Sequence, residues 1–310
     1  MKKTPSPNDL INSALKRLLT ADPWLKPYEN IIHHRLQKIA ETEQRLTRGK
    51  ESLADFASGH TYFGLHFEDN QWVFREWAPN ATAIFLIGDM TGWQEKDAFA
   101  LKALADGIWE ICLAADAFDH GDLYRLRIHW PGGMGDRIPA YARRVVQDPE
   151  SLIFNAQVWR PDSPYRWQCK NFQRPAEAPL IYEVHIGMAQ EEDKIGSYQE
   201  FTANILPRVK ASGYNTLQIM AIPEHPYYGS FGYQVSSFFA ASSRFGPPED
   251  LKALIDDAHK AGLAVIIDLI HSHAVSNEVE GLSRFDGTLY QYCLLYTSDA
   301  ADDDTIVGGG

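Results

Sequence analysis

An aspartate and two histidines lie close together in the segment Asp268-Leu-Ile-His271-Ser-His273, which closes an apolar run from Val265 to Ile270. The run is typical of a buried strand. In a parallel α/β barrel the reacting groups lie at the carboxyl ends of the strands, because the loops there converge on one mouth. We therefore expect Asp268, His271 and His273 to lie at such a mouth.

Further polar and aromatic residues follow two earlier apolar runs and should reach the same mouth. They are Glu183 and His185 at the end of the first run, and Glu224, His225, Tyr227, Tyr228, Tyr233 and Gln234 after the second. Aromatic rings stack on the apolar faces of sugars, and carboxylates and imidazoles hydrogen-bond sugar hydroxyls. The mixture favours a carbohydrate over a phosphate or hydride carrier, and the sequence has neither a Gly-x-Gly-x-x-Gly turn nor a P-loop.

Several of these residues have alternative explanations that stay open. An aspartate at a strand end is often a helix cap or a local hydrogen-bond acceptor. His271 and His273 could form a metal pair, although no third ligand is evident nearby. Trp77 and Trp109 lie within strand-like runs and are expected in a core, whereas Trp93 lies in a turn and is the better candidate for exposure.

After Pro179 the sequence alternates between strand and helix patterns, which predicts parallel βαβ units. The predicted strands are Leu180–Ile186, Leu217–Met220 and Leu263–Ile270. One helix should begin at the capping box Ser197-Tyr-Gln-Glu200 and another at Pro248, where proline and two acids suit a first turn. The long connection from Ile222 to Pro247 is predicted to be functional, because long connections in compact domains usually are.

Before Pro179 the pattern is that of strands, preceded by helices. Short β-branched or aromatic runs predict a β-sandwich of about 100 residues. They are Tyr62–Phe67, Trp72–Trp77, Thr82–Ile87, Ile108–Leu113 and Leu123–Trp130. The predicted organisation is a helical segment over 1–58, interrupted at Pro23 and Pro27, a sandwich over 59–161, a linker over 162–179, a barrel part over 180–292 and a non-native tail over 293–310.

Composition excludes several classes of function. The formal net charge of −12 over 310 residues argues against a nucleic-acid partner. Three widely spaced cysteines indicate neither disulfides nor a zinc site, and nothing in the sequence requires a metal or cofactor. No secretory leader or membrane-spanning run is evident. We therefore expect a cytoplasmic protein with no membrane partner.

Longer motifs resemble one family. The segments Gly232–Leu251, Asp268–His273 and Phe285–Thr288 closely resemble the alpha-amylase superfamily and, within it, the 1,4-alpha-glucan (glycogen) branching enzymes. Phe74-Arg-Glu-Trp-Ala-Pro79 and Gly88-Asp-Met-Thr-Gly-Trp93 are similar to the glucan-binding module that precedes such barrels. Asp22-Pro-Trp-Leu-Lys-Pro-Tyr28 is similar to the helical N-terminus of the family. The resemblance covers about residues 15 to 292.

The resemblance implies a fold and roles for individual residues. The fold would be a helical segment, an immunoglobulin-like β-sandwich and an incomplete (β/α)8 TIM barrel. Tyr233 would stack on the glucose at the cleavage point of an α-glucan such as glycogen or starch, while Asp268 and His273 would bind its hydroxyls. Trp93 would contribute to glucan binding by the sandwich. Ser272 stands where many amylases have an asparagine that helps to hold calcium, so the resemblance gives no reason to expect that metal.

The chemistry implied is double displacement with retention, in which a 6-hydroxyl of a glucan replaces water as the acceptor. In the family the nucleophile and the acid follow later strands, so we expect both to be absent from this chain and the chain to be an inactive fragment. A debranching hydrolase and a non-catalytic glucan-binding protein are the alternatives. The tail after Tyr292 is similar to translated sequencing-adapter sequence. We further expect the sandwich to keep a core of its own.

Overall fold

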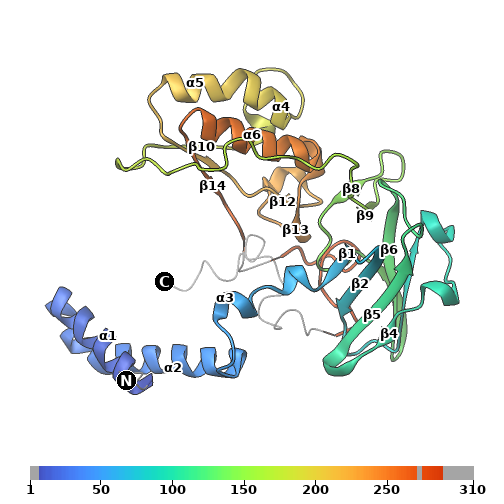
Figure 1. Cartoon of the computed structure of the whole chain (residues 1–310), viewed down its shortest axis with the longest axis horizontal. Helices are drawn as coiled ribbons and strands as arrows, with labels where there is room; N and C mark the ends of the chain where they lie inside the picture. Colours follow the sequence, from blue (N-terminus) through green and yellow to red (C-terminus); the bar gives the residue numbers. More distant parts are fainter. Residues whose placement is uncertain (1–6, 271–273, 289–310) are drawn as a thin grey trace, which may run out of the picture. The chain divides into compact units, whose positions relative to one another are not determined.

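The computed structural model describes residues 7–270 and 274–288, which belong to two compact units that divide after Tyr62. His271, His273 and the tail predicted over 293–310 lie outside the described residues. Figure 1 shows the elements of both units along the chain.

The first unit is helical, with a break at the two prolines. Its elements are α1 (Pro7–Ala21), η1 (Pro23–Tyr28), α2 (Glu29–Thr47), α3 (Leu53–Phe56) and η2 (Gly59–Thr61). The carboxylate of Asp22 accepts a hydrogen bond from the backbone N–H of Trp24 at 3.0 Å and caps the tight turn that follows. The predicted interruption at Pro23 and Pro27 is confirmed. None of the helices in the described ranges combines the length and apolarity needed to cross a bilayer.

The second unit begins with two antiparallel sheets (Figure 1). The first sheet has the order β1 (Gly64–Glu68), β2 (Gln71–Trp77), β5 (Ile108–Ala114) and β4 (Lys102–Ala103). The second has the order β3 (Ala83–Gly88), β6 (Leu123–Trp130), β9 (Phe154–Gln157) and β8 (Val145–Gln147), with β7 (Gly133–Arg137) on β6. All five predicted runs coincide with strands, whereas β4, β7, β8 and β9 were not predicted.

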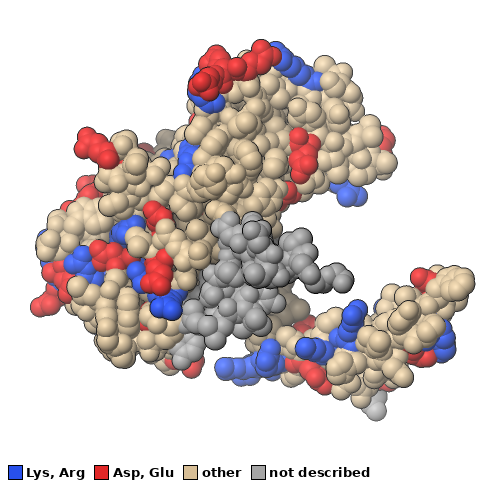
Figure 2. Space-filling model, turned by 180° about the vertical axis from the view of Figure 1, so that it is seen from behind, with Lys and Arg blue, Asp and Glu red and all other residues tan. Residues whose placement is uncertain are grey.

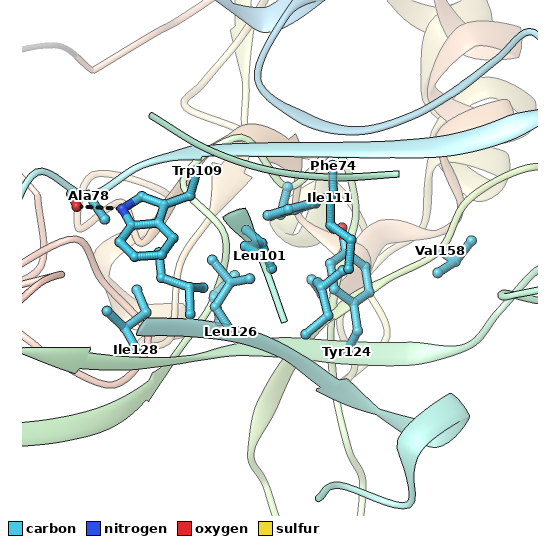
Figure 3. Packing of buried hydrophobic residues seen from close by; sticks show 14 of the residues in the cluster. Phe74, Ala78, Leu101, Trp109, Ile111, Tyr124, Leu126, Ile128 and Val158 are labelled. Atoms are coloured by element: carbon cyan, nitrogen blue, oxygen red, sulfur yellow. Dashed lines mark hydrogen bonds between the residues drawn. The ribbon is translucent and has the colours of Figure 1, made fainter. Parts of the chain in front are cut away.

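Buried side chains from both sheets form the core of the sandwich. In Figure 3, Phe74 and Ile111 of one sheet face Tyr124, Leu126 and Ile128 of the other. Burial of these large apolar groups is the main stabilising contribution.

The two tryptophans that were expected in this core behave differently. Trp109 is buried, and its indole donates a hydrogen bond to the carbonyl of Ala78 at 3.0 Å (Figure 3), which confirms the prediction. The prediction for Trp77 is wrong, because its side chain is only half-buried and its indole donates to the carbonyl of Asp106. In β2, Trp77 is out of phase with Trp72 and Phe74, and alternate residues face opposite sides of a strand.

The sandwich core is not self-contained, contrary to our expectation. Phe285 and Ala240, which lie far along the chain, are buried in the same apolar cluster, and Leu282 packs against it. The backbone around Phe285 is held by the buried guanidinium of Arg137, which donates to the carbonyls of Phe285 and Arg284. The sandwich core therefore includes side chains from later in the chain, while the parallel strands and their helices bury a separate cluster.

Three parallel strands follow, in the order β10 (Ile181–Val184), β11 (Thr216–Ile219) and β14 (Ala264–Ile267). Their helices are α4 (Tyr198–Glu200), α5 (Leu206–Ala211) and α6 (Pro248–Lys260). The capping box of Ser197 and Glu200 is present, and Phe201, Val209 and Leu254 pack in the core against the sheet. The predicted βαβ units are confirmed for these three strands.

A wide π turn, Phe201–Ile205, joins α4 to α5. The N–H of Leu206 donates to the carbonyl of Phe201, which is the spacing of a π turn. Pro207, in the first turn of α5, has no N–H to donate to the carbonyl four residues earlier.

The parallel sheet has one apolar face that packs against helices and one mixed face, called the polar face here because it carries Glu183 and Gln218. Val184 and Ile219 pack against the helices, whereas Glu183, Gln218 and Ile266 are in register on the opposite side. Ile266 is 41% exposed on that side. At the carboxyl ends of the strands, on this side of the sheet, Asp268 meets Gln218 and Tyr233.

Candidate functional site

Asp268 and Tyr233 meet at the carboxyl ends of the parallel strands. Asp268 directly follows β14, and its backbone N–H donates to the carbonyl of Ile219 at 3.0 Å, which fixes its position beside β11. Its Oδ1 accepts a hydrogen bond from Gln218 Nε2 at 3.0 Å, and the hydroxyl of Tyr233 donates to Oδ2 at 3.3 Å. Two residues predicted as substrate-binding are thus in direct contact, although they are 35 positions apart.

A glycine allows the loop that carries Tyr233 to approach the sheet. Gly232 has a φ of +89°, and a Cβ at this position would lie 1.8 Å from the carbonyl oxygen of Ala221. Only glycine permits this approach and this backbone conformation. Burial, followed by the charge of Asp268 and the hydrogen bond to it, raises the pKa of the Tyr233 hydroxyl. Tyr233 therefore stays protonated at neutral pH and acts as the donor.

The connection between β11 and α6 is anchored from within by Glu224, which is fully buried. This connection contains β12 (Pro223–Glu224), η8 (Tyr228–Ser230), β13 (Ser237–Ala241) and η9 (Ser243–Phe245). The carboxylate of Glu224 accepts hydrogen bonds from Ser242 Oγ, Ser243 N, Ser243 Oγ and one Arg244 nitrogen, at 2.7–3.1 Å. Burial raises its pKa, and the hydrogen bonds and Arg244 oppose that effect.

These contacts correct the expectation that Glu224 and His225 face a ligand. The carboxylate holds its own loop, and His225 is fully buried with Nδ1 2.9 Å from the carbonyl oxygen of Pro223. Burial lowers the pKa of His225 to about 4, so this imidazole is neutral near pH 7.

The other aromatic and imidazole residues of the predicted mouth are divided between core and surface. His185 is buried against the rings of Tyr228, Phe231 and Phe245, and burial lowers its pKa. Tyr227 is 64% exposed. His185 therefore lies at the end of its strand as predicted, but its side chain is packed in the interior and does not face a ligand.

His273 and His271 lie outside the described residues, so the predicted role of His273 and the metal pair stay predictions. Within the two described ranges no group of three or more His, Cys, Asp or Glu side chains could hold a metal ion.

Sequence reasoning missed Gln218. Its side chain lies on the polar face of the sheet, within hydrogen-bond distance of Asp268 and 3.4 Å from Glu183 Oε1. The available signal was a polar residue inside the apolar run Leu217–Met220, since such a residue in a buried parallel strand needs a polar partner.

A second candidate surface surrounds Trp93 in the sandwich. Trp93 is half-buried at the end of η3 (Asp89–Thr91), with a φ of +62°, and its indole donates to Asp89 Oδ1 at 3.2 Å. Close by in sequence, Glu95 Oε1 lies 2.9 Å from His129 Nε2. Figure 2 shows charged side chains of both signs on the described part of the face in that view.

Two family models match parts of the chain. Residues 62–149 match the carbohydrate-binding module 48 (isoamylase N-terminal domain), and residues 192–285 match the alpha amylase catalytic domain. Two similar solved structures are a putative alpha amylase from Salmonella typhimurium and the GBS pullulanase SAP. Each has a TM-score of 0.57, with 22% and 19% identity, and they cover 69% and 68% of this chain and 34% of their own. They bear on the fold alone.

Curated relatives are more similar in sequence. A 1,4-alpha-glucan-branching enzyme of Yarrowia lipolytica is 42% identical over 87% of this chain, and one of Dictyostelium discoideum is 40% identical over 89%. A third, from Solanum tuberosum, is 41% identical over 87%. The chain spans 40%, 41% and 32% of the length of these relatives. Over the part that it spans, the chain belongs to the 1,4-alpha-glucan-branching enzyme family of the alpha-amylase superfamily.

Proposed function

We propose that this chain forms the glucan-binding and substrate-positioning part of an enzyme that branches α-glucans. Such an enzyme cleaves an α-1,4 link and transfers the released chain to a 6-hydroxyl. The observation that carries the proposal is the contact between Tyr233 and Asp268 at the ends of parallel strands, in a sequence about 40% identical to branching enzymes.

The geometry suits a glucose unit. Each carboxylate oxygen of Asp268 accepts one hydrogen bond from the protein and can accept another from a sugar hydroxyl. The hydrogen bond to Asp268 engages only the hydroxyl of Tyr233. The face of the ring can therefore stack on the apolar side of the sugar. Holding the sugar in one orientation would align its anomeric carbon for double displacement. His273 is proposed to bind a further hydroxyl.

The finer assignments belong to this proposal. The three parallel strands would be the first of a (β/α)8 barrel, whose later strands would carry the nucleophile and the acid. The chain by itself would then show no turnover. A cytoplasmic location, with neither nucleic acid nor membrane as a partner, remains our proposal from composition.

The sandwich would bind α-glucan through Trp93. The match to a carbohydrate-binding module supports this assignment. Aromatic rings on module surfaces recognise sugars by stacking.

A chimera tests the proposal. Residues 1–288 would replace the matching part of the Yarrowia lipolytica branching enzyme, and proton NMR would count α-1,6 linkages formed in amylose. New α-1,6 linkages are the expected result. New reducing ends without such linkages would favour the debranching or hydrolytic alternative. A folded chimera that binds glycogen without either product would favour a binding protein.

A further inference from the structure

Gln218 lies between two acidic side chains on the polar face of the parallel sheet. It belongs to the middle strand β11, while Glu183 belongs to β10 and Asp268 follows β14. Gln218 Nε2 donates to Asp268 Oδ1 at 3.0 Å and lies 3.4 Å from Glu183 Oε1. Glu183 and Gln218 are direct partners in the strand register, so both side chains project from the same face.

The chemistry of its neighbours explains why an amide suits this position. Ionised carboxylates only accept hydrogen bonds, and an amide NH2 group carries two hydrogens to donate. Gln218 can therefore donate one hydrogen bond to Asp268 and one to Glu183 without adding a charge. A glutamate here would place a third carboxylate between the two acids, and like charges at this distance repel.

The orientation of Asp268 follows from these contacts. One of its oxygens is bonded to Gln218 and the other to Tyr233, so rotation of the carboxylate breaks at least one hydrogen bond. A binding group whose geometry is fixed before the ligand arrives loses less entropy on binding. Gln218 supplies the shorter of the two contacts and comes from the centre of the sheet.

We propose that Gln218 is a positioning residue that holds the Asp268 carboxylate in the orientation in which it meets Tyr233 and a glucose unit. This inference deepens the proposed function and rests on it for the identity of the sugar. Gln218 acts through Asp268 and does not itself contact the glucan.

The test is carbon NMR of the full 310-residue chain with tyrosine labelled at Cζ, because this carbon reports the acceptor of the tyrosine hydroxyl. Tyr233→Phe assigns the resonance. We expect Gln218→Met to shift the Tyr233 resonance in the same direction as Asp268→Ala. The double variant should match Asp268→Ala alone, because the effect of Gln218 passes through Asp268. Gln190→Met is the matched control, since Gln190 bonds the carbonyl of Lys194 instead.

A Tyr233 resonance that stays in place in Gln218→Met but moves in Asp268→Ala would overturn the inference. If Gln218→Met disturbs all tyrosine resonances, Gln218→Glu provides the second comparison, and it should move only the resonance of Tyr233. Adding maltoheptaose to the unmodified chain tests the proposed function separately. If the Tyr233 resonance does not shift on addition of maltoheptaose, sugar binding at this place is rejected. The comparison of Gln218→Met with Asp268→Ala would still test the positioning role.

Discussion

The carboxylate of Asp286 accepts a hydrogen bond from the backbone N–H of Asn80 at 2.9 Å, although the two residues are 206 positions apart. Asn80 Nδ2 donates in turn to the carbonyl of Asp286 at 2.9 Å. This reciprocal pair holds the segment of Phe285 against the sandwich, where the Phe285 ring is fully buried. The sandwich is therefore held in part by residues that lie far beyond it in the sequence.

Phe285→Ala should destabilise the sandwich. Loss of a fully buried phenylalanine ring costs about 3–5 kcal/mol, because both burial and packing are lost. Urea unfolding followed by tryptophan fluorescence measures the change. Val279→Ala, at a side chain that is 49% exposed, is the control and should change stability by less than about 0.5 kcal/mol. Equal stability of Phe285→Ala and the parent chain would contradict the contribution of Phe285 to the sandwich core.

Glu76 should make stability depend on pH. Burial raises its pKa from 4.5 to about 7, although the N–H groups of Trp77 and Ala140 bond its oxygens. The folded state therefore holds this proton more tightly than the unfolded state does. Its contribution is fully present below about pH 4.5 and is lost as pH rises through about 7, in total about 3 kcal/mol.

Urea unfolding between pH 4 and 8 measures this effect of Glu76. The fall in stability with rising pH should be shallower in Glu76→Gln than in the parent chain, whatever the constant cost of the substitution. Glu150→Gln, at an exposed position, should keep the parent slope. Identical slopes in all three proteins would show that Glu76 does not titrate in this range.

The ion pair of Glu224 and Arg244 should be important for the loop that carries Tyr233. Arg244→Met leaves a fully buried carboxylate without its counter-ion, which costs about 3–5 kcal/mol. Thermal and urea unfolding measure the loss. Lys252→Met removes an exposed partner of Glu249 and should cost less than about 1 kcal/mol. Similar small losses in both variants would refute the anchoring role.

Trp93→Ala should weaken binding of the chain to glycogen. Aromatic stacking contributes about 0.5–1.5 kcal/mol, so a roughly 2- to 10-fold loss of affinity is expected. Affinity electrophoresis in glycogen gels measures retardation. Trp24→Ala is the control, because Trp24 is 87% exposed in the helical unit. Retardation that survives Trp93→Ala unchanged would exclude this tryptophan as the stacking surface.

Periodicity and local chemistry predicted much of the fold. The capping box of Ser197 and Glu200 is encoded within four residues, and the helix begins there. β7 was missed because Gly133-Met-Gly-Asp-Arg137 has no β-branched or aromatic residue. This strand is stabilised by its pairing with β6, which is a tertiary contact that local sequence does not encode.

The candidate site was predicted in part. Asp268 and Tyr233 follow apolar runs, and the topology of parallel strands brings them together. Glu224 and His225 have equally suitable side chains, yet both are buried, and the direction of a loop side chain cannot be read from its neighbours in sequence. Gln218 was missed because its role appears only when the register of three strands is known.

The central claim is that Asp268 and Tyr233 position the glucan for branching. The most direct measurement is the rate at which the chimera with residues 1–288 lowers the iodine absorbance of amylose, compared with the same chimera carrying Asp268→Ala or Tyr233→Ala. We predict that each variant folds but branches about 100-fold more slowly, because a substrate displaced by about 1 Å reacts about 100-fold more slowly. Lys252→Met should keep the parent rate. Branching at the parent rate in both variants would contradict the account.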